Sequence, residues 1–186
     1  MIEITNEQIE RVNLILGNVK NAPNKVFNSV INRALTTVRS ETGKQIREVY
    51  TISQKDLRAE SNIRLRKAGG SNLAGEIVFA GCKIPLYRFD VTPKQPGKGT
   101  VKARVMKSKT QTAFEHAFIA QMKSGHTGIF ERDTRKRTPV TEIQGLAVAQ
   151  MAANSVVLEK VEAAAQETID KRVEQEITRI LNGYGG

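Results

Sequence analysis

The chain has 186 residues, of which 39% are hydrophobic and 26% charged, a globular composition that excludes a disordered tail. No stretch approaches the roughly 18 uninterrupted apolar residues of a membrane span, and residues 1–5 lack the pattern of a secretion signal. We therefore expect a soluble protein made in the cytosol. The single cysteine, Cys82, cannot form an internal disulfide, and with only His116 and His126 beside it we expect no metal site and no cofactor.

Positive charge is concentrated in the middle of the chain. The formal net charge is +10, with 22 basic and nine acidic side chains in residues 33–139 but four basic and seven acidic ones in residues 140–186. Such a region attracts polyanions such as nucleic acid, and equally an acidic protein surface, including that of a neighbouring copy. Aromatic residues are only 5% and there is no Trp, so any nucleic-acid contact is expected at phosphates rather than by base stacking.

The N-terminal third is predicted to be helical. Residues 6–17 carry apolar side chains at helical spacing, with Asn6 as the expected N-cap and Gly17 as the stop. A longer helix is predicted over residues 23–49, continuing through Gly43. Ser53 and Asp56 then have the spacing of a capping box, which predicts a brief third helix over residues 53–60.

The period then changes to the alternation typical of strands, with glycine or proline in each gap. We predict four strands of one largely antiparallel sheet, at residues 63–66, 77–79, 86–91 and 101–105. Cationic side chains alternate with apolar ones on these strands, so one sheet face meets the core and the other faces solvent or a partner; the outward residues are Arg64, Arg66, Lys102 and Arg104.

Two basic loops and a hairpin complete the central region. Residues 92–99 hold two prolines and two glycines without an apolar anchor, which predicts a mobile, projecting, cationic loop. A hairpin is predicted over residues 114–132, and a second exposed basic stretch follows at residues 133–139.

A short helix is predicted over residues 146–152 and a long one over residues 157–181, capped by Asn154 and Ser155. The fold class is therefore α+β: long N-terminal and C-terminal helices packed on a mostly antiparallel sheet with projecting basic loops. We predict one domain over residues 1–186, helical in 1–60, with the sheet and basic loops in 61–132 and the C-terminal helices in 145–182.

Catalytic signatures are not found. Gly69-Gly70-Ser71 and Gly97-Lys98-Gly99-Thr100 lack the spacing of a phosphate-binding loop and are interpreted as turns. Cys82 has no nearby histidine to activate it and is interpreted as a structural thiol. The acidic residues of the central region are scattered among cations rather than gathered for a divalent cation. We expect no enzymatic activity.

Several segments in order resemble the minor tail protein Z family of lambda-like tailed phages and prophages, the tail-completion proteins. The segments that carry the resemblance are Val30–Ser40 leading to Arg47–Tyr50, Ser53–Leu57, Ile63–Leu65, Phe118–His126, the basic stretch Arg132–Arg137, and Pro139-Val140. The match covers most of residues 20–145.

The resemblance implies a non-catalytic structural protein of the virion tail or neck. It implies a ring of copies of the chain, hexameric in the family, at the head-proximal end of the tail, where it supports head–tail joining and DNA passage. The implied partners are other copies, tail terminator, tail tube or head–tail connector proteins, and DNA phosphates in the channel, with no membrane.

Charge alone leaves a second function open, a standalone sequence-nonspecific nucleic-acid-binding module. Neither a recognition helix nor an aromatic sheet favours it, because the cations are spread over strands and loops. Long basic arms at residues 92–109 and 131–138 favour assembly. The cations expected to contact neighbouring subunits, an adjoining tail protein or DNA are Lys94, Lys98, Lys102, Arg104, Lys107, Lys109, Arg132, Arg135, Lys136 and Arg137.

Overall fold

The computed structural model describes residues 3–97 and 99–183. It has helices at both ends and antiparallel strands between them, which confirms the predicted α+β class. Two compact units are distinguished. Unit 1 comprises residues up to Thr42, Ile63–Val78 and residues from Leu158 on, and unit 2 comprises Gly43–Asn62 and Phe79–Val157. The single domain with three segments stays a prediction.

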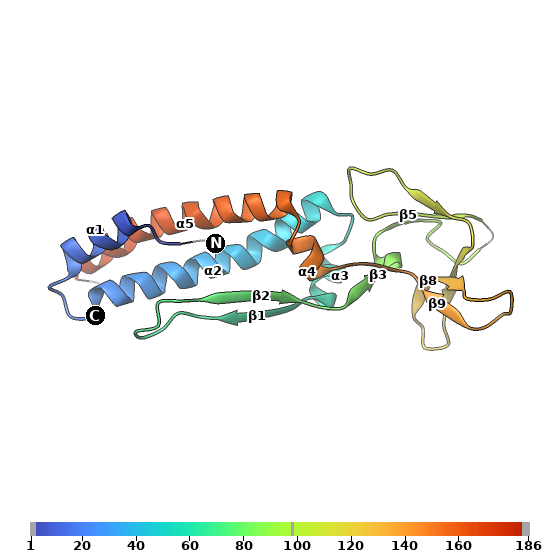
Figure 1. The fold of residues 1–186 in the computed structure, drawn as a ribbon, viewed down its shortest axis with the longest axis horizontal. Helices are drawn as coiled ribbons and strands as arrows, with labels where there is room; N and C mark the ends of the chain where they lie inside the picture. The colour runs from blue at the N-terminus through green and yellow to red at the C-terminus, as the bar shows by residue number, and fades with distance from the viewer. Residues whose placement is uncertain (1–2, 98, 184–186) are drawn as a thin grey trace. The chain divides into compact units, whose positions relative to one another are not determined.

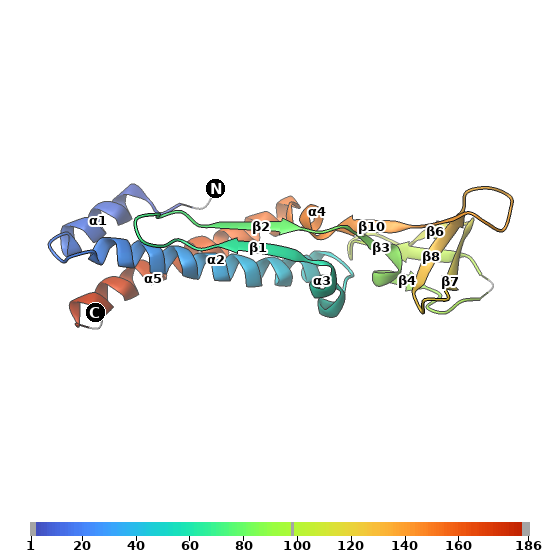
Figure 2. The ribbon, with the colours of Figure 1, turned by 90° about the horizontal axis from the view of Figure 1, so that it is seen from below.

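Unit 1 is built on three helices and a strand hairpin. Its elements are α1 (Asn6–Leu16), the greater part of α2 (Ala22–Val49) and of α5 (Ser155–Leu181), and most of β1 (Asn62–Arg66) and β2 (Glu76–Ala80). Figure 1 shows α1, α2 and α5 side by side in this unit, and Figure 2 shows the β1–β2 hairpin lying along α2. The core between the helices consists of Val12, Leu16, Ala22, Val26, Phe27, Val30, Ala34, Ile169, Val173 and Ile177.

The predicted long C-terminal helix is confirmed, and its buried stripe has a regular spacing. Every fourth residue from Val157 to Ile177 is buried. Because four residues advance slightly more than one turn of 3.6, this stripe winds around α5. Leu158 and Leu181, two apolar residues of the predicted helix, are 44% and 61% exposed. Leu158 lies off the winding stripe and faces solvent, whereas Leu181 continues the spacing of the stripe one step beyond its last buried residue, Ile177.

Local hydrogen bonds identify the N-cap residues of the two short helices α1 and α3. Thr5, not Asn6, is the N-cap of α1, because Gln8 N donates to Thr5 Oγ1 at 3.3 Å and Thr5 N donates to Gln8 Oε1 at 3.1 Å. Asn6 is already the first helical residue. The predicted cap of α3 (Gln54–Glu60) is confirmed, since Asp56 N donates to Ser53 Oγ at 3.1 Å.

Unit 2 holds most of the strands, in small antiparallel sheets. Its elements, besides α3, are β3 (Lys83–Pro85), a 3₁₀ turn η1 (Leu86–Arg88), β4 (Asp90–Thr92), β5 (Val101–Arg104), β6 (Thr112–Phe114), β7 (Ala117–Gln121), β8 (Thr127–Arg132), β9 (Val140–Glu142), β10 (Gln144–Ala147) and α4 (Val148–Ala152). The sheet orders are β4–β5–β6, β7–β8–β9 and β10–β3, and β1–β2 form a separate pair.

The prediction of one sheet from the first four strands is wrong, since these strands fall into two separate sheets, β1–β2 and β4–β5–β6. The strand predicted over residues 86–91 is interrupted by η1, where Phe89 N bonds back to Leu86 O at 3.1 Å. The hairpin predicted over residues 114–132 is the shorter β7–β8 pair, since Phe114 pairs with Val101 in another sheet. The helix predicted from Leu146 begins two residues later because β10 pairs with β3.

No helix within residues 3–97 and 99–183 is long and apolar enough to cross a membrane.

Candidate functional site

The nine predicted contact cations that the structure describes all belong to unit 2, where they lie in three places. Lys94 lies in the β4–β5 loop, and Lys98 of the same loop lies outside the described residues. The second group, on β5 and the turn after it, consists of Lys102, Arg104, Lys107 and Lys109. The third, at the end of β8 and in the β8–β9 turn, consists of Arg132, Arg135, Lys136 and Arg137. Figures 1 and 2 show the β4–β5 loop and the β8–β9 turn as separate projections at the end of unit 2 remote from α3.

Cations from the first two groups meet around one open pocket. Lys94, Arg104 and Lys107 line a space of about 720 Å³ together with Arg88. Two ion pairs lie in the lining of this pocket. In the first, Arg88 Nη1 lies 2.9 Å from an Asp56 carboxylate oxygen. Arg104 Nε lies 2.6 Å from an Asp90 oxygen.

The pocket is left with a positive charge by this pairing. Both of its carboxylates are engaged by the two arginines, whereas Lys94 and Lys107 are exposed and make no ion pair with the described part of the chain. An anionic group entering the pocket would therefore meet two ammonium groups that are not neutralised.

The segment between α2 and α3 fixes the backbone of this pocket. The Thr51 hydroxyl donates to Arg104 O at 2.8 Å and accepts from Asp90 N at 3.1 Å, so one side chain ties β4 and β5 to the end of α2. Lys107 N donates to Val49 O at 2.9 Å. The second half of the predicted arm at residues 92–109 is thus held against the helical segment by hydrogen bonds.

The first half of this arm has one anchor. The Tyr87 hydroxyl donates to Lys94 O at 2.7 Å, which fixes the backbone at the point where the Lys94 side chain leaves it. Tyr87 belongs to η1, the turn that interrupts the predicted strand. Sequence reasoning assigned no site role to Tyr87 or Arg88. Pro85, directly before them, favours a turn and was the available signal.

The β8–β9 turn is closed by one of its own cations. Arg132 Nη1 donates to Arg137 O at 2.7 Å, and its guanidinium carbon lies 4.9 Å from the centre of the Phe118 ring. Arg135, Lys136 and Arg137 are exposed as predicted and make no ion pair within residues 3–97 and 99–183. Arg132 therefore shapes the turn, and the following three side chains extend from it.

The predicted cations accordingly differ in what they already bind. Arg104 and Arg132 have partners within the chain. Lys102 projects from β5 between buried Val101 and Ala103, and Lys109 is exposed in the turn that follows. The cations best placed to bind another molecule are Lys94, Lys102, Lys107, Lys109, Arg135, Lys136 and Arg137.

The described residues contain no group of three or more His, Cys, Asp and Glu side chains able to hold a metal ion. His126 Nε2 instead lies 2.6 Å from a Glu142 oxygen, which joins the residue before β8 to the end of β9. Cys82 is exposed between β2 and β3.

A family model described as prophage minor tail protein Z matches residues 8–184. No curated protein and no solved structure matches the chain. Because the family model covers nearly the whole sequence, the chain belongs to the prophage minor tail protein Z family, which confirms the resemblance noted in the sequence. It is therefore a structural protein of the phage tail.

Proposed function

We propose that this tail protein is a subunit of a ring at the head-proximal end of the tail, where it completes the tail for head–tail joining and DNA passage without catalysing a reaction. The ring is hexameric, and its neighbours are tail terminator, tail tube or connector proteins. The observation that carries the proposal is the set of exposed cations on unit 2 that make no ion pair with the described residues of the chain: Lys94, Lys107, Arg135, Lys136 and Arg137.

An acidic surface that these cations would suit is present in the same chain. The residues from 140 to the end carry seven acidic and four basic side chains, and Glu159 and Asp170 are exposed on α5. In an assembly of identical subunits, a basic surface on one copy and an acidic helix on the next attract each other and fix the orientation of approach. Uneven charge within one subunit therefore supports assembly.

Contact with DNA in the channel is part of the same proposal. Cations on an exposed turn attract phosphate oxygens without reading sequence. The three consecutive cations Arg135, Lys136 and Arg137 have this arrangement, since they extend from a turn held by Arg132. They suit a channel through which any genome sequence passes.

The test replaces two of these cations in the phage or prophage that encodes the protein. The variant Arg135→Glu/Lys136→Glu is compared with Arg39→Glu/Lys160→Glu, which reverses two exposed cations of unit 1. We expect the first variant to fold but to be depleted from purified tails, with infectious particles reduced at least tenfold, and the second to be close to wild type. Incorporation of the first variant at wild-type level with full infectivity would refute the role of the turn.

The alternative, a standalone nucleic-acid-binding module, predicts a different result. A module binds DNA as a monomer, and its affinity falls steeply with salt according to the number of phosphates contacted. A ring subunit is instead found in the particle. Electron microscopy of intact particles with this chain located at the head-proximal end of the tail supports the ring, whereas its absence from particles together with salt-sensitive DNA binding supports the module.

A further inference from the structure

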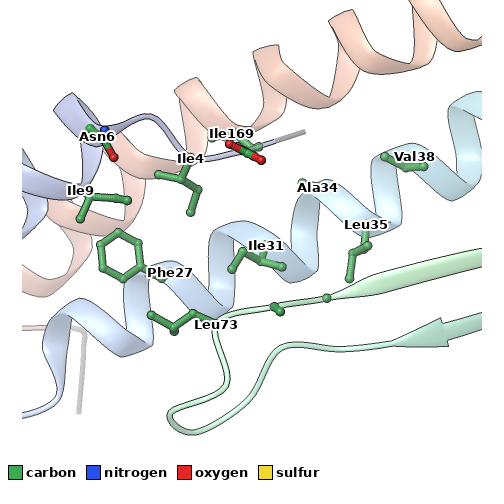
Figure 3. Close-up of a pocket in the computed structure, with 13 residues that line it drawn as sticks. Ile4, Asn6, Ile9, Phe27, Ile31, Ala34, Leu35, Val38, Leu73 and Ile169 are labelled. Atoms are coloured by element: carbon green, nitrogen blue, oxygen red, sulfur yellow. The ribbon is translucent and has the colours of Figure 1, made fainter. Parts of the chain in front are cut away.

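Unit 1 carries an apolar groove that its own core does not fill. The groove has a volume of about 570 Å³. Figure 3 shows Ile4 and Ile9 from the N-terminal segment and α1 on one side, and Phe27, Ile31 and Leu35 from α2 with Leu73 from the β1–β2 connection on the other. A space of this size and lining accepts more than one aliphatic side chain.

The same unit exposes an apolar surface elsewhere, at the end of α1 and in the turn to α2. This corner patch consists of Leu14, Ile15 and Val19, which are 87%, 38% and 48% exposed. Leu14 is the most exposed of the large hydrophobic side chains that the structure describes. An exposed apolar surface is unfavourable in water and commonly marks an interaction site.

The corner patch does not fill the groove of its own chain. At about 100° per residue, Leu14 lies about 140° around α1 from Ile9, which lines the groove. It also lies about 160° from Val12 and Leu16, which are fully buried in the core. Leu14 therefore extends from the side of α1 that faces away from the rest of unit 1.

We propose that the corner patch of one copy docks into the groove of a second copy. The inference rests on the proposed multi-copy assembly and names one of its contacts. Charge favours the pairing, because Glu3 lies at the groove and exposed Lys20 follows Val19 in the patch, which places opposite charges at the two surfaces. Burying the patch in the groove removes both apolar surfaces from water.

The two surfaces are different, so the contact is head-to-tail. Each copy that uses its patch still offers an empty groove, and each copy that uses its groove still offers a patch. Repetition of such a contact generates a closed ring when the rotation per subunit closes, and an open chain when it does not. A single contact of this kind is therefore sufficient to build the proposed ring without a second type of interface.

Directed disulfide formation tests the contact. In a Cys82→Ser background, which removes the only native cysteine, one protein carries Leu14→Cys and another carries Leu73→Cys. Mild oxidation of the mixture is expected to give a covalent dimer in high yield, while each protein alone gives little. The control pairs Leu73→Cys with Leu181→Cys, a position 61% exposed on the last turn of α5, and is expected to give no more dimer than random collision.

Association without cross-linking provides the second measurement. Leu14→Asp and Leu73→Asp change exposed or partly exposed positions and are expected to leave the fold intact. Each alone is expected to weaken concentration-dependent association at least tenfold by sedimentation velocity. Mixed together they are expected to form a dimer and nothing larger, since the mixture contains one intact patch and one intact groove per pair.

The outcomes separate this contact from the proposed function. Absence of the Leu14–Leu73 disulfide in solution and in purified tails, or a dominant Leu14–Leu14 disulfide, would overturn the head-to-tail contact even if the protein forms rings. Protection of the Leu73→Cys thiol from a maleimide without any linked dimer would also overturn it, because another molecule then fills the groove. Loss of tail incorporation by Arg135→Glu/Lys136→Glu tests the proposed function and leaves this disulfide unchanged.

Discussion

Ser29 in α2 donates a hydrogen bond to Glu176 in α5, with 2.7 Å between Oγ and Oε1. The Glu176 residue is only 5% exposed, and its other carboxylate oxygen accepts from Arg179 Nε at 2.8 Å. A carboxylate in this position loses most of its hydration, and these bonds compensate for that loss. The pair therefore fixes α2 against α5 at a defined register, which apolar side chains alone do not specify.

Replacing this carboxylate is expected to destabilise unit 1. Glu176→Ala leaves the Ser29 hydroxyl without its partner and removes a charge-assisted bond, which lowers the free energy of unfolding by about 2 kcal/mol. Glu174→Ala is the matched control, because Glu174 pairs with Arg11 at 2.9 Å on the surface of the same helix and is expected to cost about 0.5 kcal/mol. Urea unfolding followed by the helical circular dichroism signal measures both, and equal midpoints would contradict the role of the buried carboxylate.

The β1–β2 connection is bonded to α2 through two asparagines, of which Asn32 makes a reciprocal pair of bonds. Asn32 Nδ2 donates to Ala68 O at 3.0 Å, and Ala68 N donates to Asn32 Oδ1 at 2.9 Å. Asn32→Asp keeps the acceptor but loses the donor, so we expect faster amide hydrogen exchange at Ala68 and a loss of about 1–2 kcal/mol. Asn28→Asp is the control, because Asn28 makes a single bond, to Gly70 O at 2.9 Å. Unchanged exchange at Ala68 in Asn32→Asp would contradict a role of the bond from Asn32 Nδ2 to Ala68 O in holding the hairpin.

The helices could be predicted from the sequence because their signals are local. In α2 and α5 the signal is an apolar residue repeated every three or four positions. In α3 it is the Ser53 cap, whose residues lie within one turn. The α1 cap was placed one residue too late, since both Thr5 and Asn6 are good N-cap residues and only the reciprocal bond with Gln8 distinguishes them.

The strand pairing could not be predicted in the same way. Alternation shows that a segment is extended but not which neighbour it bonds, and β10 pairs with β3 although about 60 residues separate them. The 3₁₀ turn at Leu86–Arg88 takes the place of the first half of a predicted strand, so Arg88 enters the pocket beside Asp56. Contacts between residues so far apart in the sequence depend on the folded chain rather than on the conformational preferences of neighbouring residues.

Site residues were predicted by charge alone, which does not show how each cation is used. The structure gives Arg104 and Arg132 partners within the chain and leaves Lys94, Lys107 and Lys136 exposed. Asp90, the partner of Arg104, lies 14 positions earlier in the sequence on the neighbouring strand. Only knowledge of strand register identifies that pair, so the sequence could not separate structural cations from available ones.

The β8–β9 turn is expected to depend on the guanidinium of Arg132. Arg132→Lys keeps the charge but cannot bond Arg137 O and contact the Phe118 ring with the same planar group. We expect trypsin to cleave the turn at Arg135–Arg137 at least fivefold faster in this variant, with little change in global unfolding. Arg137→Lys keeps the backbone carbonyl that accepts the bond and serves as the control. Equal cleavage rates in Arg132→Lys and wild type would contradict the role of Arg132.

Two cations on β5 are expected to have different roles: Arg104 stabilises unit 2, and Lys102 binds other molecules of the tail. Arg104→Ala leaves the partly buried Asp90 carboxylate without its 2.6 Å partner, so we expect a loss of about 1 kcal/mol in unfolding free energy. Lys102→Ala changes an exposed side chain on the same strand and is expected to alter stability by less than about 0.5 kcal/mol. If cations of this surface bind other molecules of the tail, Lys102→Ala, combined with Lys107→Ala, reduces incorporation into particles while its unfolding curve matches wild type. Thermal unfolding and the amount of the protein in purified tails distinguish these roles. Replacing a docking cation lowers only the amount in tails, whereas replacing a structural cation lowers the unfolding temperature.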